Sequence, residues 1–160
     1  MPSFRSIAVD SSFMNAVRVA VQRLPHCYQL PTYAHTGDAG LDLYAANTRT
    51  LTIAAATFER IPTGIALGLP AGYMAFVQPR SGLAMRHGIS VLNTPGLIDS
   101  GYRGEIVVLL INHSQQAFTV ERGHRIAQLV VLPVPTVHLL EVEALDGTER
   151  QDGGFGSSGV

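Results

Sequence analysis

The chain has 160 residues, of which 46% are hydrophobic and 14% are charged, so it can bury one hydrophobic core and we interpret it as a single domain. Its net charge of −1 excludes the extended basic surface that binding to nucleic acid requires. No apolar run approaches the roughly 18 residues that span a bilayer, so we expect a cytoplasmic protein without membrane contacts.

The chain begins with residues 1–16, which we interpret as an N-terminal extension with a short helical stretch near Ser12 to Ala16. Beyond it, alternating apolar residues and β-branched runs predict a series of strands. In chain order these are VRVAVQRL from Val17, LDLYA from Leu41, TLTIA from Thr50, GIALGLP from Gly64, GYMAFVQP from Gly72, GEIVVLLIN from Gly104 and RIAQLVVLPV from Arg125. Pro, Gly and Asn clusters separate the strands, which predicts an all-β sandwich or barrel with its core in residues 17–144.

Two short regions fall outside this strand pattern. SGLAMRHG, after Pro79, is long enough for only one or two helical turns. From about Leu145 the sequence becomes DGTERQDGGFGSSGV, which lacks apolar periodicity. We therefore predict a flexible C-terminal arm, residues 145–160, that belongs to the same single domain.

The stretch PRSGLAMRHGI places Arg80, Ser81 and Gly82 directly after a predicted strand, where the helical stretch opens. Backbone N–H groups, a hydroxyl and a guanidinium meet there, which is typical of an anion-binding site. The alternative is an ordinary helix start, in which Ser81 caps the helix and Arg80 is a surface residue.

The stretch NTPGLIDSGYRGEI, from Asn93, contains two turn signals around an apolar pair, an acid and an aromatic residue. This order predicts a hairpin that lines a cleft. Taken alone, Asp99 is better explained as a turn-forming residue and Tyr102 as part of the core.

Two further strands carry polar residues. In AGLDLYA, Asp42 lies between two leucines, so its carboxylate faces away from the core side, and a solvated outer face is the alternative. In RGHRIAQL, Arg125 and Gln128 are three residues apart and lie on opposite faces unless a bulge intervenes. The closing GGFGSSG lacks the lysine of a Walker A loop, which excludes a P-loop fold but allows a phosphate clasp on the arm.

In this order, the stretches AGLDLYA, PRSGLAMRHGI, NTPGLIDSGYRGEI, RGHRIAQL and RQDGGFGSSG resemble the five motifs of the trimeric deoxyuridine triphosphatase (dUTPase) family, and they span residues 39 to 159. Gly101 and Gln151 stand where the family more often has an acid and a glycine, and Arg86 stands where lysine is common. The resemblance implies a distorted jelly-roll barrel of the β-clip type, assembled as a homotrimer. In that trimer the active sites are shared between subunits, and each mobile arm closes over a neighbour's site.

The resemblance also implies an activity: hydrolysis of dUTP to dUMP and pyrophosphate, which supplies dUMP for thymidylate synthesis and keeps uracil out of DNA. Water attacks the α-phosphorus in line with the help of magnesium (Mg²⁺), and Asp99 matches the residue that activates this water. Ser81 suits the oxygen that bridges the scissile bond. Asp42 and Gln128 match residues that hold the metal through water, and Gln128 is also counted among the catalytic residues.

The resemblance assigns the remaining substrate contacts to three groups. The phosphates are bound by Arg80, Ser81, Gly82, Arg125 and Arg150. The uracil slot is formed by Asn93, Leu97, Ile98 and Asp99, extends to Val107, and has Tyr102 beneath the deoxyribose. In the arm, the expected contacts are Phe155 on the base and Gly156, Ser157 and Ser158 on the phosphates.

Two alternative functions remain open. A dCTP deaminase shares this fold and much of the pocket, but it needs an acid that activates water at the pyrimidine ring. A catalytically silent nucleotide-binding regulatory module keeps the pocket without turnover. The glycine-rich arm argues against the deaminase, and Asp99 together with the arm argues against the silent module.

Overall fold

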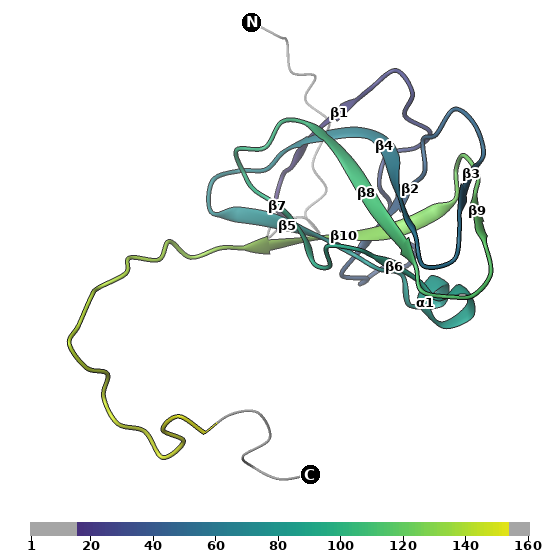
Figure 1. Ribbon diagram of the computed structural model, residues 1–160. Helices are drawn as coiled ribbons and strands as arrows, with labels where there is room; N and C mark the ends of the chain where they lie inside the picture. The colour runs from purple at the N-terminus through teal and green to yellow at the C-terminus, as the bar shows by residue number, and fades with distance from the viewer. Residues whose placement is uncertain (1–15, 154–160) are drawn as a thin grey trace, which may run out of the picture.

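The computed structural model describes residues 16–153, and this part of the chain folds into ten β-strands and one short helix (Figure 1). The elements are β1 (Ala20–Arg23), β2 (Leu41–Tyr44), β3 (Leu51–Ile53), β4 (Phe58–Gly68), β5 (Tyr73–Gln78), α1 (Ser81–His87), β6 (Ile89–Val91), β7 (Gly96–Ile98), β8 (Glu105–Asn112), β9 (Phe118–Val120) and β10 (Arg125–Pro133). Apart from Ala16, the predicted N-terminal extension lies outside the described residues. Within those residues, no helix has the length and apolar character needed to cross a membrane.

The strands form two four-stranded sheets and a two-stranded ribbon, and every pairing is antiparallel. The sheet orders are β1-β4-β8-β6 and β2-β10-β5-β7, and β3 pairs with β9. Two antiparallel sheets joined by crossing connections are the arrangement of a jelly roll. The predicted all-β, jelly-roll-like fold is confirmed.

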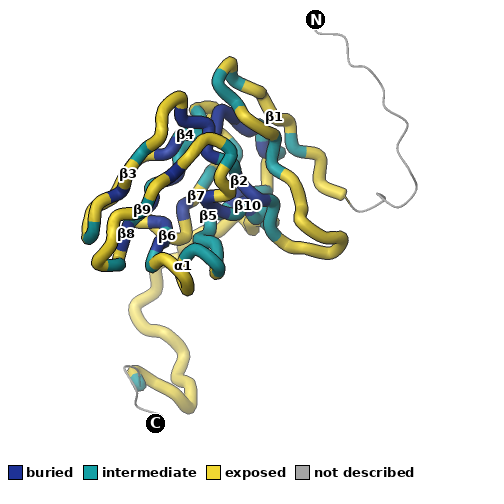
Figure 2. Tube along the Cα trace, turned by 90° about the vertical axis from the view of Figure 1, so that its right-hand side faces the viewer, coloured by how far each residue is buried: buried dark blue, intermediate teal, exposed yellow. Residues whose placement is uncertain are grey.

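The core consists of buried residues along the strands of both sheets, as the burial colouring shows (Figure 2). In β8 every second residue is buried, so Ile106, Val108 and Leu110 face the core and their neighbours face outward. The sequence predicted this strand from its run of β-branched and other apolar residues, and the period of two is seen only in the burial. The prediction for β4 was less accurate, because the strand begins at Phe58 and not at Gly64.

The last strand, β10, ends at Pro133, and residues 134–153 contain neither helix nor strand. This part of the chain extends away from the sheets (Figure 1). Within it, residues 134–144, here named the connecting segment, carry large apolar side chains with high exposure, including Leu139 at 95% and Leu140 at 85%. The predicted division between core and arm at residue 145 stays a prediction.

Candidate active site

A carboxylate between two guanidinium groups forms the centre of the candidate site. Asp42 on β2 is only 3% exposed. Its Oδ1 lies 3.2 Å from Arg80 Nε, and its Oδ2 accepts a hydrogen bond of 3.1 Å from Arg125 Nη1. Arg80 Nη1 also donates to the Arg125 carbonyl at 3.2 Å. The solvated outer face considered for Asp42 is therefore wrong, because the two arginines cover the carboxylate and compensate its charge. We name these three residues the Asp42 cluster.

A β-bulge in β10 brings Arg125 and Gln128 to the same face of the sheet. Gln128 lies opposite Asp42 and Arg125 lies opposite Tyr44, with a register shift between Arg125 and Ala127. Asp42 and Tyr44 are two residues apart and so share a face, and their partners on β10 share it too. The sequence placed Arg125 and Gln128 on opposite faces unless a bulge intervened, and the structure contains that bulge.

A row of polar side chains crosses the sheet beside this cluster. Gln128 pairs with Asp42 on one side and with Gln78 of β5 on the other. Thr94 Oγ1 lies 3.4 Å from Gln78 Oε1 and continues the row toward the turn before β7. The sequence prediction missed Gln78, because its place beside Gln128 depends on the pairing of β5 with β10.

Helix α1 begins next to the cluster and leaves backbone donors available. Its N-cap is Arg80, without a side-chain cap, so the alternative in which Ser81 caps the helix is wrong. The third and fourth helical N–H groups donate to the Arg80 carbonyl, while those of Ser81 and Gly82 have no intrahelical acceptor. A Cβ at Gly82 would lie 3.0 Å from Arg86 Nη2, so a further guanidinium lies against this turn.

The cluster fits a metal that is held through water. Among residues 16–153, no group of three or more His, Cys, Asp or Glu side chains forms a direct ligand cage. Asp42 Oδ1 is buried and accepts no well-aligned hydrogen bond within the described chain, although Arg80 Nε lies 3.2 Å away. Because Mg²⁺ keeps several of its water ligands, an oxygen with spare acceptor capacity beside the Gln128 amide suits its water shell.

The stretch predicted as a hairpin lies at the edge of a sheet. The hairpin itself is wrong, because β7 pairs with β5, whereas β6 and β8 belong to the other sheet. Between β6 and β7 the chain turns through Asn93 and the cis peptide Thr94-Pro95. Leu97 is 54% exposed and Ile98 is half-buried. In the described chain β7 is the edge strand of its sheet, so one side of its backbone is free to bond with a ligand.

Asp99 and Tyr102 lie in the turn that follows this edge strand. Tyr102 N–H donates to the Asp99 carbonyl at 3.1 Å, and the Asp99 side chain is exposed. Tyr102 is 45% exposed, so a place in the core is wrong for it. Its hydroxyl donates to the Glu105 carbonyl at 3.1 Å, and a Cβ at Gly104 would lie 2.6 Å from Tyr102 Cζ. The ring therefore lies against the backbone of Gly104 and remains partly exposed.

Within one chain, the Asp42 cluster and the turn that carries Asp99 do not lie together. On β5, Gln78 pairs with Gln128 beside the Asp42 cluster, whereas Ala75 pairs with Ile98. Asp99 follows Ile98, so along the strand direction it lies about four residues from Gln78, or about 13 Å at 3.3 Å per residue. The cluster and the Asp99 turn are separate surfaces of the described chain.

The other predicted contact residues lie away from the cluster or outside the described residues. Arg150 is exposed in the part of the chain that extends away from the sheets, where its Nε donates to the Gly153 carbonyl at 2.8 Å. Val107, on β8, lies opposite Pro62 of β4 and is half-buried. The predicted contacts outside the described residues are Phe155, Gly156, Ser157 and Ser158.

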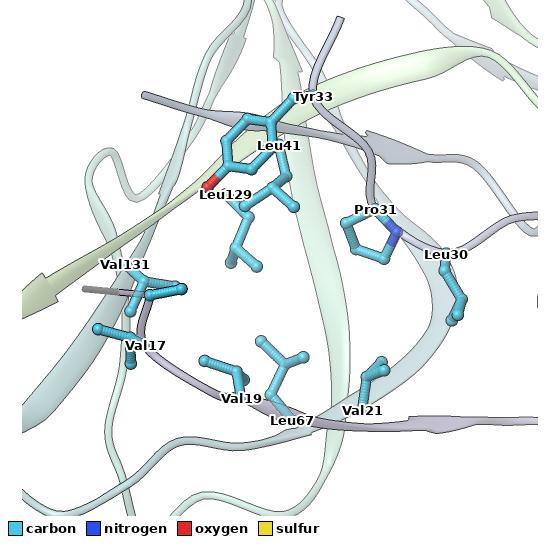
Figure 3. A pocket seen from close by; sticks show the side chains of 11 residues that line it. Val17, Val19, Val21, Leu30, Pro31, Tyr33, Leu41, Leu67, Leu129 and Val131 are labelled. Carbon is cyan, nitrogen blue, oxygen red and sulfur yellow. The ribbon is translucent and has the colours of Figure 1, made fainter. Parts of the chain in front are cut away.

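An apolar cleft of about 580 Å³ lies on the other face of β2 and β10 (Figure 3). No predicted site residue lines it, although Leu41 and Leu129 are chain neighbours of Asp42 and Gln128. The lining residues are Ala16, Val17, Val19, Val21, Leu30, Pro31, Tyr33, Leu41, Leu67, Leu129 and Val131. Their apolar character suits protein packing better than a triphosphate.

Comparison with known proteins gives concordant results. The family model described as dUTPase matches residues 27–159. The deoxyuridine 5'-triphosphate nucleotidohydrolase of Gloeobacter violaceus is 72% identical over 146 residues, which are 91% of this chain and 99% of that protein. The protein of the same name from Alkaliphilus metalliredigens is 47% identical and matches over 89% of this chain and 97% of its own.

The solved structure of Staphylococcus bacteriophage 80alpha dUTPase with dUPNHPP superposes with a TM-score of 0.81 at 28% identity. The superposition covers 89% of this chain and 99% of the phage protein. The fold, the order of the motifs and the sequence relatives agree. This chain belongs to the dUTPase family.

Proposed function

We propose that this chain hydrolyses dUTP to dUMP and pyrophosphate. Water attacks the α-phosphorus, the bond to the oxygen that bridges the α- and β-phosphorus breaks, and the electron pair leaves with pyrophosphate. The observation that carries the proposal is the buried Asp42 between Arg80 and Arg125, beside Gln128, in a chain of the dUTPase family.

The phosphate half of the site consists of the cluster and the start of α1. Arg80 and Arg125 offset charge on the triphosphate, and the Ser81 hydroxyl donates to the bridging oxygen as it becomes a leaving group. The Ser81 and Gly82 N–H groups add donors that the helix itself does not use. Such fixed donors stabilise developing charge without reorganising during the reaction.

Magnesium is the proposed cofactor, held through water by Asp42 and Gln128. When bound, Mg²⁺ neutralises charge on the phosphates and on the leaving pyrophosphate. The support from this chain is the spare acceptor capacity of Asp42 Oδ1 and the Gln128 amide opposite it.

Asp99 is proposed to orient and deprotonate the attacking water. Because Asp99 lies about 13 Å along the strands from Gln78 and its strand β7 is three strands away from β2, which carries Asp42, we propose that a homotrimer completes the site, with Asp99 of one copy facing the cluster of another. The apolar connecting segment, with Leu139 and Leu140 exposed, supports a partner surface. The apolar cleft on the far face of β2 and β10 supports it as well.

The half of the site around β7 and the Asp99 turn is proposed to select uracil and deoxyribose. Backbone groups of Leu97 and Ile98 on the edge strand, with the Asn93 amide, pair with the base, and the slot extends to Val107. Cytosine exchanges an acceptor for a donor there and leaves buried polar groups unpaired. The exposed Tyr102 ring takes the sugar, where a 2′-hydroxyl is proposed to have no room.

The C-terminal arm is proposed to close over the bound nucleotide. Arg150 moves to the phosphates, and Phe155 stacks on the base. The backbone of Gly156 and the donors of Ser157 and Ser158 then surround the phosphates. Stacking on a base contributes about 1–3 kcal/mol, which offsets the ordering of only one or two residues, so the triphosphate must contribute as well.

Pyrophosphate release from dUTP in Mg²⁺, with UTP, dCTP and dTTP as controls, tests the proposal. We expect release from dUTP alone at comparable concentrations. Ammonia from dCTP would favour a deaminase, and tight dUTP binding without pyrophosphate release would favour a silent binding module.

A further inference from the structure

Glu105, the first residue of β8, joins three parts of the chain. Its Oε1 accepts a hydrogen bond of 2.7 Å from the Gly64 N–H and lies 2.8 Å from His26 Nε2. Its backbone carbonyl accepts the Tyr102 hydroxyl at 3.1 Å. The side chains of His26 and Glu105 are 33% and 24% exposed, so both are largely enclosed. One residue thus connects the loop before β2, the middle of β4 and the turn that carries Tyr102.

This contact stands where the β4–β8 ladder is interrupted. Regular pairing stops at Pro62 opposite Val107 and resumes at Ala66 opposite Glu105. Gly64 lies in the gap, is buried, and has a φ of 72°. A buried N–H that loses its ladder partner is costly unless another acceptor replaces it. The Glu105 carboxylate is that acceptor, so it fixes the start of β8 against β4.

The position of the Tyr102 ring depends on this start of β8. The ring lies on Gly104, where a Cβ would be 2.6 Å from Tyr102 Cζ, and its hydroxyl is bonded to the Glu105 carbonyl. A displacement of the backbone at Gly104 and Glu105 therefore moves the ring with it. Discrimination by exclusion of a hydroxyl is sensitive to such shifts, because misplacement of about 1 Å can change rates by up to about 10²-fold.

We infer that the His26–Glu105 pair is a positioning clamp that holds the Tyr102 ring and thereby sets the preference for deoxyribose over ribose. This inference rests on the proposed function, in which the sugar lies on Tyr102. Neither His26 nor Glu105 touches the nucleotide in this account. Both act through the backbone on which the ring rests.

The test compares kcat and KM for dUTP and UTP in the full-length wild type, Glu105→Ala, Glu105→Gln and His26→Ala. Glu59→Ala is the matched control, because Glu59 is an exposed glutamate on the same β4–β8 pair. We expect Glu105→Ala to lower the ratio of kcat/KM for dUTP to that for UTP by about 10-fold or more. Glu105→Gln keeps an acceptor oxygen and should restore most of the ratio, and Glu59→Ala should leave it unchanged.

If Glu105→Ala fails to fold, His26→Ala replaces it, because this variant keeps the hydrogen bond from the Gly64 N–H to Glu105. In His26→Ala the ratio of kcat/KM for dUTP to that for UTP should also fall, but by a smaller factor. An unchanged ratio in folded His26→Ala and Glu105→Ala would overturn the clamp, and so would equal losses for both nucleotides. A wild type that releases no pyrophosphate from dUTP would instead overturn the proposed function itself, and the clamp with it. The ratio of the dissociation constants of UMP and dUMP, measured by calorimetry, should change by the same factor as the ratio of kcat/KM for dUTP to that for UTP.

Discussion

Gln128 lies directly opposite Asp42 across the β10–β2 ladder, one step beyond the bulge that places Arg125 on the same face. This pairing puts an amide beside a buried carboxylate that two arginines already flank. The arrangement concentrates charge and hydrogen-bonding capacity on one face of the sheet. The opposite face of the same two strands borders an apolar cleft instead.

Replacing Asp42 by asparagine should weaken the response to magnesium. The amide keeps the shape but loses the charge that balances Arg80 and Arg125 and orders metal-bound water. We expect the Mg²⁺ concentration for half-maximal pyrophosphate release to rise about 10-fold, by analogy with mutations of indirect metal contacts. A magnesium titration identical to that of the wild type would contradict the role of Asp42.

Asp99→Asn should remove turnover and leave nucleotide binding nearly intact. A positioned base contributes about 10²- to 10⁴-fold, so kcat should fall by a factor in that range. Pyrophosphate release and calorimetric titration with a non-hydrolysable dUTP analogue measure the two effects separately. Asp38→Asn is a suitable control, because the new amide oxygen can still accept the His35 N–H that binds Asp38 Oδ2. A kcat near that of the wild type would refute the role of Asp99.

A chain that ends before Arg150 should fold and assemble but lose most of its activity. Residues 150–153 belong to no strand, so the truncation removes none of the described strands. Loss of base stacking alone should lower kcat/KM for dUTP by about 10-fold or more. Circular dichroism and light scattering check folding and assembly. Full activity in the truncated chain would show that the arm is not a lid.

Gly64→Ala should destabilise the fold much more than Gly72→Ala. Both glycines have positive φ, 72° and 80°, so both alanine variants share the backbone strain. A Cβ at Gly64 would also lie 2.8 Å from Cys27 Cβ, whereas nothing lies within 4 Å at Gly72. We expect a loss of about 1 kcal/mol at Gly72 and about 3 kcal/mol or more at Gly64. Equal midpoints in urea unfolding would contradict this packing.

The long strands could be predicted from the sequence because they contain sustained runs of β-branched and other apolar residues. For β8 and β10 the expected spans agree with the observed ones within one residue at either end. Three residues are too few to show a period, and β6 and β9 were missed. The equally short β3 was predicted from its β-branched residues, and β7 was expected only as part of a hairpin. Their pairing is determined by partners far away in the sequence.

The residue types of the site could be read from the sequence, but their surroundings could not. Asp42 is buried because α1 and β10 bring Arg80 and Arg125 over it, which alternation within β2 does not encode. Gln78 joins the polar row only through the register of β5 with β10. The separation of Asp99 from the cluster likewise depends on register.

A working site is proposed to combine the Asp42 cluster of one copy with Asp99 of another. Subunit mixing tests it most directly: Asp99→Asn and Arg80→Ala chains are co-expressed with different tags, and trimers that contain both are purified through both tags. Each parent homotrimer should be inactive. In a closed trimer with head-to-tail interfaces, about one site in three of a mixed trimer then carries two intact halves, so about a third of wild-type pyrophosphate release should return. Mixed trimers as inactive as their parents would contradict the shared site.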